Sequence, residues 1–210
     1  EVKVMDCDLG NAAQVTQLLA AIDKDNIDID LLVNNAGFAT AGQFVDLPWD
    51  GEMQELQVNV VSLPQICHGI GQRMAKAGRG QILNVSSVTG FMAGPWMANY
   101  AAGKAFVLSF SESIREELAP RGVKVSVLCP GTTQTPFFDK ASISVEEAAP
   151  AFLVMTPEQV ATHTLKALDR NVAVIVPRFH NKLSAFLPRI APRWLLRKVV
   201  GALYKKVAPK

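Results

Sequence analysis

The sequence predicts an α/β fold, a doubly wound parallel sheet in a single domain with helices on both faces. Three observations lead to this prediction. Short strand-like segments alternate along the chain with longer segments of helical periodicity. The strand-like segments are continuous apolar runs, as in sheets that are buried on both faces. The length of 210 residues suits one domain with a sizeable core.

The individual elements follow from local patterns. Strands are predicted where apolar and β-branched runs end in turn-forming residues, at 2–5, 31–33, 81–85 and 123–128. Helices are predicted where apolar residues recur at helical spacing, at 11–23, 49–77 and 98–118. Pro64 and two glycines weaken the prediction of one continuous helix at 49–77. The segment 86–97 is rich in Gly, Ser and Pro, which indicates a loop.

Composition narrows the class of protein. With 49% hydrophobic and 19% charged residues, the chain has the composition of a globular domain. Its three cysteines, Cys7, Cys67 and Cys129, are odd in number and lack metal-ligand spacing, so we expect buried, reduced thiols and no metal. No uninterrupted apolar run reaches the roughly 18 residues of a membrane span, and no leader is expected at the start. These features predict a cytoplasmic location.

Small polar residues follow four of the predicted strands. They are Asp8, the segment 34–37, the segment 86–90 and the segment 130–135. Ligands of open α/β sheets bind beyond the carboxyl ends of the strands. We therefore expect the functional site at this edge of the sheet.

Tyr100 and Lys104 lie four residues apart on a predicted helix and so share one face. An ammonium beside a phenol favours the phenolate, so Lys104 is expected to lower the pKa of Tyr100 toward working pH and make it an acid or base. Such a pair occurs often by coincidence. Ser87, in the loop before the helix, could hold a carbonyl oxygen beside the tyrosine, or could be an ordinary capping residue. Asn59 lies in an apolar helix and needs a buried partner, either a neighbouring strand or a water.

Together these residues resemble one family, the short-chain dehydrogenases/reductases. The resemblance covers residues 2 to about 177. The motifs that carry it are Asn34-Asn35-Ala36-Gly37, Asn59, Ser87, Tyr100-Ala101-Ala102-Gly103-Lys104 and Pro130-Gly131-Thr132-Thr133-Gln134-Thr135.

The resemblance implies a Rossmann-like domain and an oxidoreductase that moves a hydride between a nicotinamide cofactor and a carbonyl or secondary alcohol. It implies that Tyr100 is the general acid or base and that Ser87 orients the substrate oxygen. Lys104 would lower the tyrosine pKa and bind the nicotinamide ribose, and Asn59 would hold a proton-relaying water.

For the cofactor, NAD or NADP, the resemblance implies contacts from several strand ends. Asp8 and Leu9 would lie near the adenine, and Asn35, Ala36 and Gly37 along the adenosine ribose and central strand. Tyr100 and Lys104 would join the contacts to the nicotinamide and its phosphate made by Pro130, Gly131, Thr133 and Thr135. Glycine at 37 and 131 would let backbone approach a ligand, although a turn alone explains a glycine as well.

One departure concerns the start of the chain. The family begins with a strand, a Gly-rich turn and a helix that binds the cofactor pyrophosphate, whereas this sequence opens at what resembles the third strand. We expect a chain that truly began at Glu1 to bind no nicotinamide cofactor detectably.

The resemblance divides the chain into a domain at 1–177, with a mobile substrate lid at about 137–157, and a tail at 178–210. The lid contains five apolar side chains, which indicate either an apolar substrate surface or simple packing: Phe137, Phe138, Phe152, Leu153 and Met155. Together with the apolar segment 94–97, they predict a hydrophobic substrate, steroid-like or fatty.

The tail has a distinct charge. The net charge is −7 over residues 1–177 and +9 over residues 178–210, because the tail has nine basic residues and no acid. Arg189, Arg193 and Arg197 recur every four residues among apolar ones, which predicts a basic amphipathic helix.

Such a helix can bind anionic lipid through 188–206 at the inner membrane surface, or can dock on the same protein or a dimer mate. Nucleic-acid binding is not expected, because no motif accompanies the charge. The family favours a homodimer or homotetramer through the helices that contain Asn59 and Tyr100. The alternative function is a catalytically silent scaffold that uses the tail for association.

Overall fold

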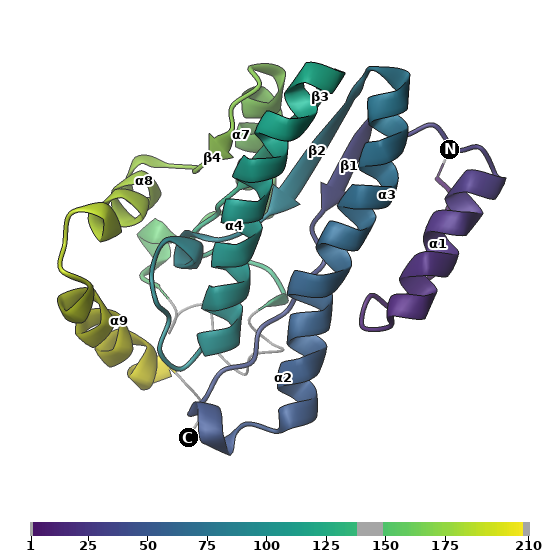
Figure 1. Cartoon of the computed structure of the whole chain (residues 1–210). Coiled ribbons are helices and arrows are strands. Elements are labelled where there is room, and N and C mark those ends of the chain that lie inside the picture. The colour runs from purple at the N-terminus through teal and green to yellow at the C-terminus, as the bar shows by residue number, and fades with distance from the viewer. Residues whose placement is uncertain (1, 138–148, 208–210) are drawn as a thin grey trace.

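The computed structural model describes residues 2–137 and 149–207. Its centre is a parallel sheet with the strand order β1-β2-β3-β4 (Figure 1). The strands are β1 (Leu31–Asn34), β2 (Gly80–Val85), β3 (Val123–Leu128) and β4 (Val174–Ile175). The predicted parallel α/β sheet is confirmed, and β3 has the predicted bounds.

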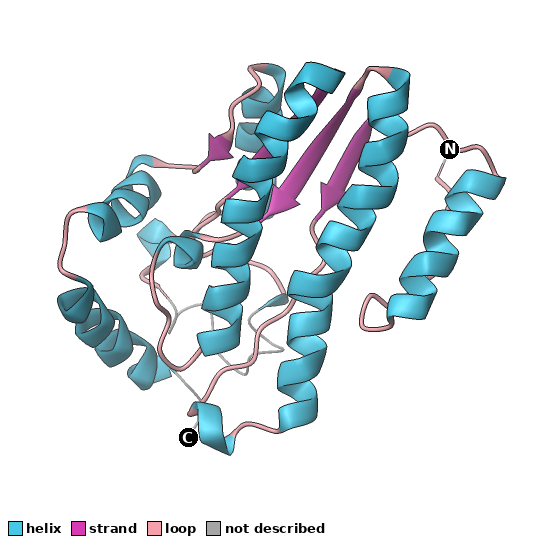
Figure 2. Cartoon of the chain, viewed as in Figure 1, coloured by secondary structure: helices cyan, strands magenta, loops and turns pink. Residues whose placement is uncertain are grey.

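Helices join and cover these strands (Figure 2). They are α1 (Ala12–Lys24), α2 (Trp49–Leu56), α3 (Ser62–Ala77), α4 (Ala98–Leu118), α7 (Pro157–Asp169), α8 (Phe179–Phe186) and α9 (Arg193–Val207). Asn11 caps α1 by accepting hydrogen bonds from the N–H groups of Ala13 and Gln14. The predicted helices are confirmed, and α4 again has the predicted bounds.

A π-helical turn, Gln57–Val61, joins α2 to α3, so the predicted helix at 49–77 runs through without a loop. Pro64 is tolerated because it falls in the first turn of α3, directly after the wider π-helical turn. Such turns often mark functional sites. This one contains Asn59.

The two faces of the sheet are covered differently. Ile82, Val125 and Val127 point to the face that carries α3 and α4, and they form the largest apolar core with Ile70 and Val107. The opposite face packs against α7 through a second cluster that includes Leu83, Leu128 and Val160. At the β1 edge of that second face, Leu31 and Val33 remain partly exposed.

The strand predicted at 2–5 is not formed. Val2 and Val4 are 88% and 86% exposed, and no described strand pairs with this segment. An alternating pattern becomes a strand only where a neighbour supplies the hydrogen-bonding partners.

Cys67 and Cys129 are buried, free thiols, as predicted, and burial raises the pKa of each to about 12. Cys7 is only partly buried, so the prediction is wrong for its burial. Within the described ranges, no group of His, Cys, Asp and Glu residues could hold a metal ion. Likewise, none of the helices described is long and apolar enough to cross a membrane.

Candidate active site

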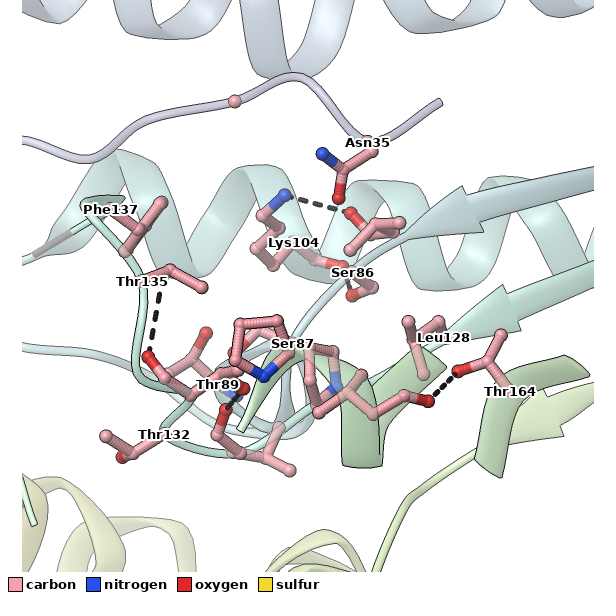
Figure 3. A pocket seen from close by; sticks show the side chains of 18 of the residues that line it. Asn35, Ser86, Ser87, Thr89, Lys104, Leu128, Thr132, Thr135, Phe137 and Thr164 are labelled. Atoms are coloured by element: carbon pink, nitrogen blue, oxygen red, sulfur yellow. Dashed lines mark hydrogen bonds between the residues drawn. The ribbon is translucent and has the colours of Figure 1, made fainter. Parts of the chain in front are cut away.

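A cavity of about 740 Å³ opens where the strands end. The residues that follow β1, β2 and β3 all contribute to its wall, as the predicted placement at the carboxyl edge requires. Lys104 and Asn35 lie on one side of the cavity, and Ser87 and Thr135 lie nearby (Figure 3). The cavity therefore collects side chains that are far apart in the sequence.

Ser87 and Tyr100 meet in this cavity. Tyr100, in the first turn of α4, is 8% exposed, and its hydroxyl is hydrogen-bonded to Ser87. Ser87 also caps the turn Val88–Phe91 by accepting a hydrogen bond from the Thr89 N–H at 3.2 Å. Its hydroxyl thus has a local structural role and a position beside the phenol.

The loop that carries Ser87 is fastened to α4. The Ser86 hydroxyl donates a hydrogen bond to the Lys104 carbonyl at 2.6 Å. Gly90 lies so close to the helix that a Cβ there would be 2.8 Å from the same carbonyl oxygen. Only a residue without a side chain permits this approach. The spacing between Ser87 and Tyr100 is therefore fixed by backbone contact.

Lys104 is buried beneath the tyrosine. Its ammonium donates a hydrogen bond to the Val85 carbonyl at 2.9 Å and lies 5.6 Å from the centre of the Tyr100 ring. Burial lowers the pKa of Lys104 to about 8, and the carboxylate of Glu55 partly opposes this shift. An ammonium has three protons, so two remain for a ligand in the cavity.

The expected lowering of the Tyr100 pKa is wrong for this arrangement. Burial raises the pKa of Tyr100 well above its ordinary value, and the hydrogen bond from Ser87 opposes the rise only in part. The Lys104 ammonium approaches the ring and points to the Val85 carbonyl instead of the phenol oxygen. Tyr100 therefore holds its proton more tightly than an exposed tyrosine does.

Asn59 is buried behind this group. Its amide donates a hydrogen bond to the Phe38 carbonyl at 2.7 Å and accepts one from the Phe38 N–H at 3.3 Å. The expected buried partner is thus the loop after β1 and not a strand. A Cβ on Gly37 would be 2.8 Å from the Asn59 side-chain oxygen and 3.6 Å from the Lys104 ammonium. Gly37 is required by close packing here, and not by a turn with positive φ.

A buried carboxyl pair adjoins these residues, and sequence reasoning missed it. Glu52 and Glu55 are 2% and 0% exposed, and both contact the Thr40 hydroxyl. The Thr40 N–H also donates to Glu55 at 2.6 Å, and the Asn99 amide donates to Glu52 at 2.7 Å. One hydroxyl has one proton to donate, so the second contact requires a protonated carboxyl. Burial raises the pKa of Glu55, and the hydrogen bonds from Thr40 oppose this rise in part.

Most residues expected to contact a cofactor line the cavity. These are Asn35, Gly37, Tyr100, Lys104, Pro130, Gly131, Thr133 and Thr135. Asp8, Leu9 and Ala36 are not among its lining residues. Asp8 instead accepts a hydrogen bond from the Gly10 N–H, and the Leu9 carbonyl accepts one from Ser62. A Cβ on Gly131 would meet the Asn181 side chain at 2.3 Å, so packing against α8 explains this glycine.

The predicted lid residues fall in different places. Phe137 lines the cavity, with its ring centre 5.4 Å from that of Tyr100. Met155 is buried, whereas Phe152 is 76% exposed and Leu153 is partly buried. Phe138 lies outside the described residues. The apolar wall at Phe137 is thus present, and Phe152 does not belong to it.

Tyr204 was not anticipated as a site residue. It comes from α9, in the tail, yet it lines the cavity and packs in the same cluster as Tyr100 and Phe137. Burial raises the pKa of its phenol. One signal was available, because Tyr204 is one of only two tyrosines in the sequence and lies on an apolar face of a helix.

Comparisons with known proteins agree with the fold and show the family. The family model for "short chain dehydrogenase" matches residues 1–145. The chain is 30% identical over 176 residues to a 7beta-hydroxysteroid dehydrogenase of Collinsella aerofaciens, covering 83% of this chain and 66% of that protein. The chain therefore spans about two thirds of the length of this relative.

Two solved structures are similar over nearly the whole chain. A short-chain dehydrogenase from Sphingobium yanoikuyae in complex with NADPH is 30% identical with a TM-score of 0.76, covering 96% of this chain and 74% of that one. A bulky-bulky ketone specific alcohol dehydrogenase from Comamonas testosteroni is 27% identical with a TM-score of 0.73, covering 98% and 74%.

Proposed function

The chain belongs to the short-chain dehydrogenase family, and from this premise we propose that it is an oxidoreductase acting on a carbonyl or secondary alcohol with NAD or NADP. One observation carries the proposal. Ser87, Tyr100 and Lys104 come from a loop and a helix and converge on a single cavity at the carboxyl edge of the sheet.

In this proposal Tyr100 transfers the proton. During reduction, its phenol gives a proton to the substrate oxygen, and during oxidation the phenolate takes it back. The Ser87 hydroxyl holds the same oxygen, since it is already hydrogen-bonded to the Tyr100 hydroxyl. A nicotinamide held in this cavity would supply the hydride chemistry at the carbonyl carbon.

The cavity residues fit the nicotinamide end of this cofactor. Lys104 has two ammonium protons beyond the one given to the Val85 carbonyl, and these suit the ribose hydroxyls. Asn35, Pro130 and Thr135 are further cavity residues that would hold the cofactor. Asp8, Leu9 and Ala36 do not line this cavity, so we do not assign them to it.

Lys104 and Asn59 complete the proton path. The side-chain oxygen of Asn59 and the ammonium of Lys104 lie on the same side of Gly37, because a Cβ added to this glycine would contact both groups. We propose that a water relays protons from Lys104 to solvent here. The amide of Asn59 is fixed by the Phe38 backbone, which keeps its oxygen in place.

The substrate is proposed to be a hydrophobic ketone or alcohol. Phe137, Met97 and Tyr204 line the part of the cavity beside Tyr100, and they offer aromatic and thioether surface. The similar proteins include a hydroxysteroid dehydrogenase and a bulky-ketone alcohol dehydrogenase. Small polar sugars would offer no apolar surface to pack against these aromatic and thioether side chains.

The test measures consumption of NADPH and of NADH by the full-length protein with a panel of ketones. We expect turnover of bulky hydrophobic ketones and none of small sugars. Turnover confined to sugars would contradict the substrate class, and no turnover with any carbonyl would contradict the enzyme assignment.

The competing proposal is a silent scaffold that keeps the fold and associates through its tail. It is favoured only if the intact protein binds no cofactor, which calorimetric titration with NADPH measures. We also propose a cytoplasmic homo-oligomer formed through the helical segments that contain Asn59 and Tyr100, the turn Gln57–Val61 and α4, where Val61 and Phe106 are exposed. Light scattering of the wild type and of Phe106→Asp tests this assembly.

A further inference from the structure

The two helices of the tail, α8 and α9, lie on the same side of the molecule (Figure 1), and each carries exposed apolar side chains. On α8, Phe179 is 81% exposed, and Leu183 and Phe186 are exposed as well. On α9, Leu195, Val199 and Leu203 are exposed and recur every four residues, so they form one stripe. We call the six residues together the outer face.

The outer face is not the side of α9 that packs on the protein. Leu196, Val200 and Tyr204 form a separate stripe that is partly buried. Leu196 borders a groove against α4, and Tyr204 lines the active-site cavity. The tail therefore already docks on its own body through one stripe. Among the described residues, nothing covers the stripe of Leu195, Val199 and Leu203.

The charge of the tail selects the partner of the outer face. From residue 178 to 210 there are nine basic residues and no acidic one. Lys198 lies over the Trp194 ring at 5.7 Å, and Trp194 is itself 56% exposed beside the stripe. Apolar, aromatic and basic side chains on one helix are the combination that binds an anionic lipid surface.

A second copy of the chain fits the outer face less well. A twofold dimer places the same patch of both copies together, so two tails that are each strongly positive would oppose one another. An anionic bilayer instead offers an apolar interior and counter-charge together.

We propose that the outer face of α8 and α9 binds anionic membrane surfaces, and that the substrate is drawn from the lipid. The lipid origin of the substrate rests on the proposed function. Tyr204 connects the proposed membrane-binding surface with the active site. It lies on the partly buried stripe of α9 and lines the cavity beside Tyr100. One helix thickness of about 10 Å separates the lipid side from the cavity wall.

Co-sedimentation with vesicles tests the surface without any assay of turnover. We expect binding of the intact protein to vesicles of phosphatidylcholine with phosphatidylserine, and at least tenfold weaker binding to phosphatidylcholine alone. Added salt should weaken the binding, because exposed charges are screened. Equal binding to both vesicles, or no binding to either, would overturn the proposal.

Variants locate the contact. Replacing Leu195, Val199 and Leu203 together by Ser should reduce binding at least tenfold, whereas Val45→Ser, which alters an apolar residue 79% exposed elsewhere, should not. Lys198→Glu provides a second variant if the triple variant melts early. Unchanged binding of Lys198→Glu would contradict the role of charge.

Fluorescence reports the depth of the contact. Trp194 emission should shift to the blue on anionic vesicles, and Trp194→Phe should abolish the shift while Trp49→Phe keeps it. Self-association that the triple variant abolishes, without vesicle binding, would assign the outer face to a second copy and refute the proposal. Vesicle binding by a protein that turns over no carbonyl would refute only the proposed function and the lipid origin of a substrate.

Discussion

Tyr204 and Tyr100 line one cavity, although one comes from the C-terminal helix and the other from the first turn of α4. The two phenols are close enough that ionisation of Tyr204 raises the pKa of Tyr100. The tail helix is therefore part of the active-site wall as well as an outer surface.

Tyr204→Ala should weaken binding of bulky substrates and leave the proton transfer in place. The expected result is a rise in KM for a hydrophobic ketone of about tenfold, the value of one or two lost apolar contacts, with a smaller change in kcat. Tyr204→Phe retains the ring and should behave like the wild type. A large fall in kcat for Tyr204→Phe would instead give this hydroxyl a part in the chemistry.

Tyr100→Phe in the full-length protein should abolish most turnover while the protein still folds. General acid catalysis contributes about 10²–10⁴-fold, so kcat should fall by at least that range. Circular dichroism and thermal melting check folding. Unchanged turnover would exclude Tyr100 as the proton donor.

The local parts of this fold were predictable from sequence. The bounds of α4 and β3 agree with the prediction because the apolar periodicity of each lies within one segment. The proximity of Tyr100 and Lys104 followed from a spacing of four on a helix, whereas the expected lowering of the Tyr100 pKa did not follow, because burial raises it. In contrast, the places of Tyr204 and Glu55 depend on which segments fold against each other. The apolar helix face of Tyr204 was a signal that it packs inward, but a local pattern does not say against which cavity. The strand at 2–5 failed for the same reason, because a strand depends on its neighbour.

Lys104 should make stability depend on pH in a defined direction. Its pKa is about 8 in the folded protein and returns to the ordinary 10.5 on unfolding, so between these values the unfolded chain binds more protons. The free energy of unfolding should therefore rise with pH across this window. Relative to Lys104→Met, the wild type should gain about 2 kcal/mol between pH 8 and pH 10. Urea unfolding of both proteins at each pH isolates Lys104, because the buried cysteines contribute equally to both.

Glu55 should contribute a pH dependence below neutrality. Burial raises its pKa in the folded protein above the ordinary 4.5, so the folded state holds the proton more tightly. The resulting stability is present below pH 4.5 and is lost as pH rises through the folded pKa. Glu55→Gln should therefore become more stable relative to the wild type between pH 4.5 and neutrality.

Glu158→Gln is the matched control for Glu55. Hydrogen bonding to Thr156 lowers the pKa of Glu158, which is exposed at the start of α7. Its contribution is present at neutral pH and is lost in acid, so this variant should show the opposite slope. Parallel slopes for the two variants would contradict the raised pKa of Glu55.

Gly90→Ala tests whether backbone contact sets the distance between Ser87 and Tyr100. The added Cβ would lie 2.8 Å from the Lys104 carbonyl oxygen and 2.9 Å from its carbon, and backbone of a helix cannot yield as a side chain does. The loop must move away from α4, which should cost about 1–3 kcal/mol and lower kcat by displacing Ser87. Gly51→Ala is the control, because its Cβ would meet only the Thr40 methyl group at 3.9 Å. That change should stabilise the protein by about 0.5–1 kcal/mol through helix propensity. If Gly90→Ala melts and turns over like the wild type, the loop tolerates displacement, and its contact with α4 does not position Ser87.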